Sequence, residues 1–207
     1  MTIRLKGTDI KLCFSFFVCF SLMLLLSDGK TALICFFSSA LHEGGHLLFM
    51  FLFSQKVSAV TLSAFGVRID REGENLLSYG KEALIALGGV LVNFFLCAVA
   101  AALFFFFKSY EAAVLFFVNL FLALLNLMPA DKLDMWNVLF CLLMKKNDVE
   151  KTVRILSVLS GATLVLFCTF SALYFVFIGF NVSLLAVCIY LIYLKLREPL
   201  NKSQHTL

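Results

Sequence analysis

Two histidines and a glutamate lie within an apolar segment that runs from Thr31 to Phe53. His42 and His46 are four residues apart. On a helix they therefore share one face, about 6 Å apart along the axis, and can bind one metal ion together. Glu43 lies beside them and can reach a water molecule on that ion. This is the HExxH pattern, which predicts a zinc-dependent peptide hydrolase.

A catalytic zinc ion takes three protein ligands and keeps a fourth position open. His205 is the only other histidine and lies in the C-terminal tail, so we expect a carboxylate, Asn or Gln as the third ligand. Asp131 and Asp134 are the conspicuous carboxylates, because they lie beside an interruption of an apolar segment, where a charge is costly. The seven cysteines form no CxxC pair, so we expect neither disulfides nor a cysteine-bound metal.

The composition predicts an all-α polytopic membrane protein. The chain has 207 residues, of which 62% are hydrophobic and 14% charged, and its mean hydropathy is +0.99. Ordinary soluble domains are only about half apolar. We expect about six transmembrane helices, at roughly Leu12–Leu26, Thr31–Phe53, Glu82–Phe107, Ala112–Met128, Thr152–Phe180 and Val182–Leu194.

The basic residues are distributed unevenly around these segments. Of the 17 Lys and Arg residues, 15 fall on one side of the expected membrane, and only Lys30 and Lys108 fall on the other. The positive-inside rule then places both termini in the cytoplasm. Because the basic residues flank spans, we expect no nucleic-acid partner. His46 is seven residues before Phe53, about 10 Å from the cytoplasmic end, so we expect water to enter from the cytoplasm.

The longest polar stretch, Ser54–Lys81, contains a predicted β-hairpin. Val57–Asp70 is rich in β-branched residues with rough alternation, and Gly66 offers a turn. A hairpin at a membrane must have its backbone hydrogen bonds satisfied. We therefore expect it at the interface or against protein.

The fourth apolar segment has an unusual exit. Pro129 cannot continue a helix, so we expect a break there, followed by a short helix over Asn137–Met144. Broken helices are tolerated in membranes where they line a cavity or a site. Asn126 lies eight residues before Asp134 and is an active-site candidate.

Small residues accompany the motif and the next apolar segment. Gly44 and Gly45 suit close helix packing, and they also leave room for a substrate backbone near a metal. Gly88 and Gly89 permit close helix contact as well, and Asn93 is an intramembrane polar group that needs a partner.

With these residues placed, the chain resembles the site-2 proteases, a family of intramembrane zinc metalloproteases. Its three motifs correspond here to His42–His46, Gly89–Asn93 and Asn126–Asp134, and the resemblance covers roughly Leu33–Met144. It implies one transmembrane protease domain over 1–207, with a three-helix core at about 31–144 and flanking helices at about 12–26, 152–180 and 182–194. Residue by residue, it implies one Zn²⁺ per chain held by His42, His46 and Asp134, Glu43 as general base, and substrate contacts from Asn126, Asn93, Gly44, Gly45, Phe65 and Gly66.

The helices around this core resemble the sporulation branch of the family, stage IV sporulation protein FB and its relatives. This implies regulated proteolysis of a membrane-associated protein such as a pro-sigma factor, an inhibitory membrane protein as a further partner, and a bacterial cell membrane. We expect no CBS domain, because nothing follows the last helix, and no PDZ domain. Met135 and Lys132 depart from the glycine and proline usual in the family.

Three other functions compete with that of a protease. A catalytically silent relative that binds membrane-protein clients is suggested by Met135, but such a protein has no need of Glu43. A metal transporter is disfavoured by the few intramembrane carboxylates and the lack of a second histidine pair. A membrane di-iron oxidase is excluded, because three histidines cannot supply its ligands.

Overall fold

The computed structural model describes residues 2–5, 8–12, 21, 24–25, 27–55, 57–63, 66–71, 77–131, 133–179 and 182–196. The chain divides into two compact units, Met1–Leu124 and Leu125–Leu207. Most of the described chain is helical, as expected, and the protein is an all-α polytopic membrane protein with a small β-sheet. The prediction of a single domain over 1–207 stays a prediction.

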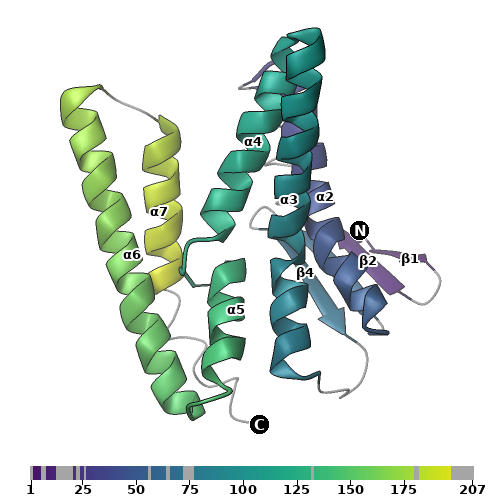
Figure 1. Ribbon diagram of the computed structural model, residues 1–207, viewed down its shortest axis with the longest axis vertical. Helices are drawn as coiled ribbons and strands as arrows, with labels where there is room; N and C mark the ends of the chain where they lie inside the picture. Colours follow the sequence, from purple (N-terminus) through teal and green to yellow (C-terminus); the bar gives the residue numbers. More distant parts are fainter. Residues whose placement is uncertain are drawn as a thin grey trace. The chain divides into compact units, whose positions relative to one another are not determined.

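In the described part of the first unit, α2 lies beside α3 (Figure 1). Their bounds agree with the predicted spans to within three residues, whereas the predicted first span, Leu12–Leu26, lies largely outside the described residues. The third helix, α4, continues across the boundary between the units. The helices are α2 (Gly29–Leu52), α3 (Tyr79–Phe107) and α4 (Tyr110–Asn126).

Local interactions fix where these helices begin and end. Asp28 caps α2, because its Oδ2 accepts a hydrogen bond from the Thr31 N–H at 3.0 Å. Lys108 ends α3 in the left-handed conformation, with φ of 51°. Asn119 of α4 is fully buried and donates to Ser38 Oγ of α2 at 2.9 Å. This buried amide therefore holds α4 against the helix that carries the histidines.

The predicted hairpin is present and belongs to a four-stranded sheet in the order β1-β2-β3-β4. Strands β3 (Val57–Ser63) and β4 (Gly66–Arg71) pair antiparallel. Strand β2 (Thr8–Leu12) pairs parallel with β3 and antiparallel with β1 (Thr2–Leu5). Strands β1 and β2 are not predicted from the sequence, because the partner of β2 in this sheet is β3, about 50 residues away in the chain. Their pairing with β3 leaves β4 as an edge strand of the described sheet.

The second unit contains α5 (Asp134–Leu143), α6 (Val149–Phe177) and α7 (Val182–Leu196), with α6 packed against both of the others (Figure 1). The break at Pro129 is present, but the short helix begins at Asp134, three residues before the predicted start at Asn137. A carboxylate in the first turn is favourable because it faces the positive end of the helix dipole. This electrostatic effect accounts for the earlier start.

A hydrophobic cluster in the second unit joins the segment after Pro129 to the last two helices. Ala130, Leu133 and Leu191 are buried at its centre, and each is no more than 5% exposed. Partly buried hydrophobic side chains surround them: Met128, Leu164, Phe167, Val187 and Tyr190. The segment between α4 and α5 is therefore packed against α6 and α7 rather than free in a loop.

Within the part of the chain that the structure describes, α2, α3 and α6 are long and apolar enough to cross a membrane, whereas α4, α5 and the Leu184–Tyr193 part of α7 are shorter apolar helices. Many large apolar side chains on them are exposed, including Phe105, Phe106 and Phe107 at the end of α3. Exposed apolar patches of this extent are expected on a surface that faces lipid. The protein is therefore a membrane protein.

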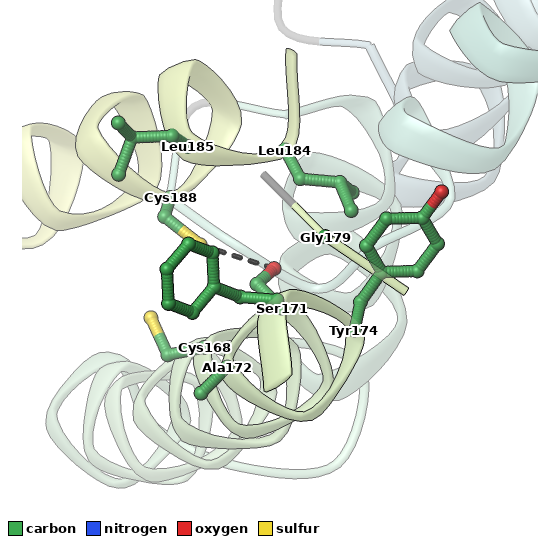
Figure 2. A pocket seen from close by; sticks show the side chains of 9 residues that line it. Cys168, Ser171, Ala172, Tyr174, Gly179, Leu184, Leu185 and Cys188 are labelled. Carbon is green, nitrogen blue, oxygen red and sulfur yellow. Dashed lines mark hydrogen bonds between the residues drawn. The ribbon is translucent and has the colours of Figure 1, made fainter. Parts of the chain in front are cut away.

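A cavity of about 320 Å³ lies between α6 and α7 within the second unit (Figure 2). Its walls are mainly apolar, and Cys188 Sγ donates a hydrogen bond to Ser171 Oγ at 3.3 Å on one side. Cys168 also lines it. None of the predicted site residues is among the described residues that line this cavity.

Candidate metal centre

The two histidines of the motif lie on one buried face of α2. His42 is 6% exposed and His46 is 9% exposed, although both lie in a helix that can span a membrane. Their ring centroids are 5.0 Å apart and the rings are nearly perpendicular, at 86°. The four-residue spacing therefore brings the imidazoles together as the sequence predicts.

A backbone carbonyl fixes the protonation pattern of His46. Its Nδ1 lies 2.8 Å from the carbonyl oxygen of Ile85, on α3. A carbonyl can only accept, so Nδ1 must carry the proton and donate it. In a neutral ring this leaves the Nε2 lone pair available to a metal ion, the arrangement that metal-binding histidines commonly use.

Asn93 holds the other histidine. It is fully buried on α3, and its Nδ2 lies 3.0 Å from Nδ1 of His42. Rotation of the amide exchanges its nitrogen and oxygen, and Asn93 Oδ1 has no hydrogen-bond partner in the present orientation. With the amide reversed, Oδ1 accepts the Nδ1 proton and the Nε2 lone pair of His42 becomes available. Asn93 can therefore set the tautomer of His42 as Ile85 sets that of His46.

Glycines of α3 make room for the imidazoles. A Cβ at Gly89 would lie 2.5 Å from Cε1 of His42 and 2.6 Å from Nε2 of His46, so a larger residue would overlap both rings. Gly45 of α2 and Gly88 of α3 bring the two helix backbones into contact. A Cβ on either glycine would collide with the backbone of the other helix. The packing expected of Gly45 is thus visible, whereas a Cβ at Gly44 would meet nothing within 4 Å.

The donor set in the first unit fits a zinc ion. It offers two neutral imidazoles, which are preferred zinc ligands. Both rings have a partner for Nδ1, and the absence of a Cβ at Gly89 allows both of them to lie against α3. Glu43 is half-buried next to His42, where the motif requires it. These residues therefore provide two ligands and an adjacent carboxylate.

The remaining predicted residues lie elsewhere in the chain. Asp134 is the first residue of α5 and Asn126 is the last residue of α4, and both are half-buried in the second unit. Gly66 begins β4, opposite Ser63. Phe65 lies outside the described residues.

Asp131, the other carboxylate considered as a ligand, is engaged within the second unit. Its Oδ2 accepts from Ser160 Oγ at 3.3 Å and lies 3.7 Å from Nζ of Lys195. Asp131 is therefore already held by two side chains of its own unit.

The contacts of Ile85, Gly89 and Lys195 with these side chains are not predicted from the sequence. A backbone carbonyl carries no sequence signal, and the sequence indicates only close helix packing and a family motif at Gly89. Lys195 is 64 residues from Asp131 along the chain, so no local pattern connects them.

No family model and no curated protein matches the chain. Among solved structures, the chain is similar to the site-2 protease from Methanocaldococcus jannaschii, with 22% sequence identity and a TM-score of 0.68. The match covers 96% of this chain and 95% of the other. It shows that the two proteins share a fold, and it confirms at that level the resemblance drawn from the three motifs.

Proposed function

We propose that this protein is an intramembrane zinc metalloendopeptidase of the site-2 protease family. The observation that carries the proposal is the pair of buried imidazoles, each with a partner for Nδ1, next to Glu43 on a helix that can span a membrane. A purely structural histidine pair would not need an adjacent acid. The shared fold with a known site-2 protease supports the same assignment.

Asp134 is proposed as the third ligand. His42, His46 and Asp134 each offer one ligand atom, and together they make the two-histidine, one-carboxylate set typical of zinc peptidases. The two histidines belong to the first unit and Asp134 to the second. On this proposal the chain holds a single Zn²⁺.

Zinc held by these residues would supply Lewis-acid activation of a water molecule and of the scissile carbonyl. Glu43 accepts the proton that the attacking water loses, and its carboxylic acid then gives that proton to the amine of the leaving peptide. The peptide C–N bond breaks as the new C–O bond forms. Burial of the histidines keeps the reaction away from bulk lipid and limits the water that reaches it.

Substrate binding is proposed to use the remaining predicted residues. Asn126 and Asn93 are amides that can hold a peptide backbone, although Asn93 already contacts His42. Gly44 leaves open space on the helix that carries the histidines. Phe65 and Gly66 belong to the hairpin, whose strand β4 lies at an edge of the described sheet. An extended substrate can add to such an edge, which is the conformation that proteolysis requires.

The edge-strand proposal can be tested with proline, which removes a backbone donor. Val67→Pro in β4 should reduce cleavage of long substrates at least tenfold and leave zinc content unchanged. Arg4→Pro in β1, at the opposite edge, is the matched control. Equal rates for the two variants would remove the edge strand from the mechanism.

We further propose that the substrate is a membrane-associated protein such as a bacterial pro-sigma factor, and that a membrane protein inhibits its cleavage.

Both termini are proposed to face the cytoplasm, and water is proposed to reach the site from that side. Single cysteines introduced between residues 126 and 134 in a cysteine-free chain should react with a membrane-impermeant maleimide only when it is supplied from the cytoplasmic side. Labelling from the outer side alone would contradict this orientation.

The proposed function is tested by zinc content and turnover together. Purified wild type and Glu43→Gln should each hold about one zinc per chain, whereas His46→Ala and Asp134→Ala should lose it. Reconstituted with a panel of single-span membrane proteins, wild type should cleave at least one, and Glu43→Gln should cleave none. Folded wild type without zinc would favour the alternative, a catalytically silent relative that binds membrane-protein clients.

A further inference from the structure

A group of buried and half-buried polar side chains lies in the second unit, outside the proposed ligand set. It consists of Asp131, Ser157, Ser160 and Lys195, and is called the Asp131 cluster below. Lys195 Nζ donates to the carbonyl oxygen of Ser157 at 3.0 Å and to its Oγ at 3.1 Å. The same Nζ lies 3.7 Å from Asp131 Oδ2, which also accepts from Ser160 Oγ at 3.3 Å. The ammonium of Lys195 thus makes two hydrogen bonds to Ser157 and an ion pair with Asp131.

The cluster joins three parts of the chain that are distant in sequence. Asp131 belongs to the segment between α4 and α5, Ser157 and Ser160 lie three residues apart on one face of α6, and Lys195 is in the last turn of α7. Asp131 is three residues before Asp134. Contacts that restrain Asp131 therefore also restrain the chain where it enters α5.

Burial of the two charged side chains of the cluster is unfavourable in free energy, because it removes them from water. The side chain of Asp131 is 9% exposed and that of Lys195 is 23% exposed. Charges removed from water cost several kcal/mol each, and a well-packed apolar pair is often at least as stable. Buried ion pairs are best attested where they specify one arrangement among several. The break at Pro129 creates that need, because a segment without helical hydrogen bonds can adopt more than one path.

The apolar neighbours of Asp131 act in the same direction. Ala130 and Leu133 are buried against Leu191 of α7. The backbone N–H of Leu133 donates to the Ala130 carbonyl at 3.1 Å, and that of Trp136 donates to the Leu133 carbonyl at 3.1 Å. The segment is thus held by its side chains on α6 and α7 and by a turn that leads directly into α5.

We infer that the Asp131 cluster is a positioning device: the α6–α7 pair holds the 127–133 segment through Lys195 so that Asp134 is kept in place to bind the metal ion. The inference rests on the proposed function for the role of Asp134. Asp131 and Lys195 are positioning residues, since they touch neither substrate nor metal in this mechanism. The inference also gives a role to the two helices that follow the predicted core.

The test compares Lys195→Met with Lys151→Met. Both remove one positive charge and keep an unbranched side chain, but Lys151 is exposed on α6. Zinc affinity is measured by competition with a chelator. Lys195→Met should bind Zn²⁺ about tenfold more weakly than wild type, because Asp134 would be less well held; this is the lower end of the loss seen when a group that contacts a metal ligand is removed. Lys151→Met should bind it as wild type does, and Lys195→Arg should recover most of the affinity.

A second measurement does not depend on the metal. Hydrogen–deuterium exchange of the 127–134 segment in metal-free protein should be at least tenfold faster in Lys195→Met than in Lys151→Met. If exchange is unchanged, or if it accelerates while zinc affinity stays the same, the inference is wrong. If wild type binds no zinc at all, the proposed function fails, and the exchange result alone decides whether Lys195 holds the segment.

Discussion

The two units hold their chemically important side chains in opposite ways. In the first unit, His42 and His46 lie within an unbroken helix, and an adjacent helix fixes them through glycine contacts and two neutral hydrogen bonds. In the second unit, Asp134 follows a break in the helix, and the segment before it is held by a charged pair and a hydrophobic cluster. A regular helix pair therefore positions the two histidines, whereas tertiary contacts position the segment that leads to Asp134.

The difference follows from what each ligand needs. A neutral imidazole can be buried at modest cost once Nδ1 has a partner, so it can lie deep in a helix pair. A carboxylate is stabilised at the start of a helix, where free N–H groups and the dipole favour negative charge. A helix that starts within an apolar segment requires an interruption of the helix before it. The interrupted backbone then needs contacts from elsewhere in the protein.

The largest effect is expected at the contact between Gly45 and Gly88. In Gly45→Ala the new Cβ would overlap the Gly88 backbone, so α2 and α3 must move apart. We expect a net destabilisation of about 1–3 kcal/mol in thermal unfolding in detergent, despite the better helix propensity of alanine. Gly161→Ala, in α6 of the second unit, is the control, because a Cβ there meets nothing within 4 Å. Equal melting temperatures for the two variants would mean that close glycine packing is not what distinguishes the first unit.

Gly89→Ala separates the space for the ligands from the packing of the helices. Its Cβ would press on the two imidazoles rather than on backbone. Side chains can shift more easily than helices, so stability should fall less than in Gly45→Ala, while zinc affinity should fall about tenfold or more, as when a metal site loses its supporting contacts. Gly44→Ala, on the helix of the histidines, should retain the affinity because its Cβ meets nothing within 4 Å. Chelator competition on the three proteins measures the difference, and full affinity in Gly89→Ala would refute the proposed position of the ion.

Asn93 tests the neutral hydrogen bonds of the first unit. Asn93→Leu removes the partner of His42 Nδ1 and should weaken zinc binding about tenfold, whereas Asn93→Asp keeps an acceptor and should preserve it. Nitrogen NMR of ¹⁵N-labelled histidine should show the Nδ1–H tautomer of His42 in the metal-bound wild type and a mixture in Asn93→Leu. The same tautomer population in both would show that Asn93 only packs.

Much of the first unit could be predicted from sequence because its signals are local. The spacing of His42 and His46 determines a shared helix face, and Gly66 with its β-branched neighbours was enough to predict the hairpin. Strands β1 and β2 could not be predicted, since their pairing with β3 depends on residues far away in the chain. The partner of His46 is a backbone oxygen of Ile85, which every residue type offers.

The second unit was predictable only in outline. Pro129 indicated the break, but Asp131 and Asp134 looked alike as candidate ligands until the family motif was considered. What separates them physically is Lys195, an ion partner contributed by the last helix. Such long-range charge pairs leave no periodicity in a sequence, and they emerge only when the helices are packed.

The smallest effect is expected at the cap of α2, which compares a helix start in the first unit with one in the second. Hydrogen bonds from Thr31 lower the pKa of Asp28 below its usual 3.8. Because the folded-state pKa is the lower one, the cap stabilises the protein above pH 3.8 and loses this contribution as the pH falls below that value. Asp28→Asn keeps an acceptor without this titration. Its melting temperature should therefore lie slightly below that of wild type at pH 7, and the gap should narrow as the pH falls below 3.8. Asp148→Asn at the start of α6, where the same Asp-to-backbone bond is made to Lys151 at 3.1 Å, provides the matched comparison for capping by an amide. A gap for Asp28→Asn that stays constant from pH 7 to pH 3 would show that the charge on Asp28 contributes nothing to the helix that carries the histidines.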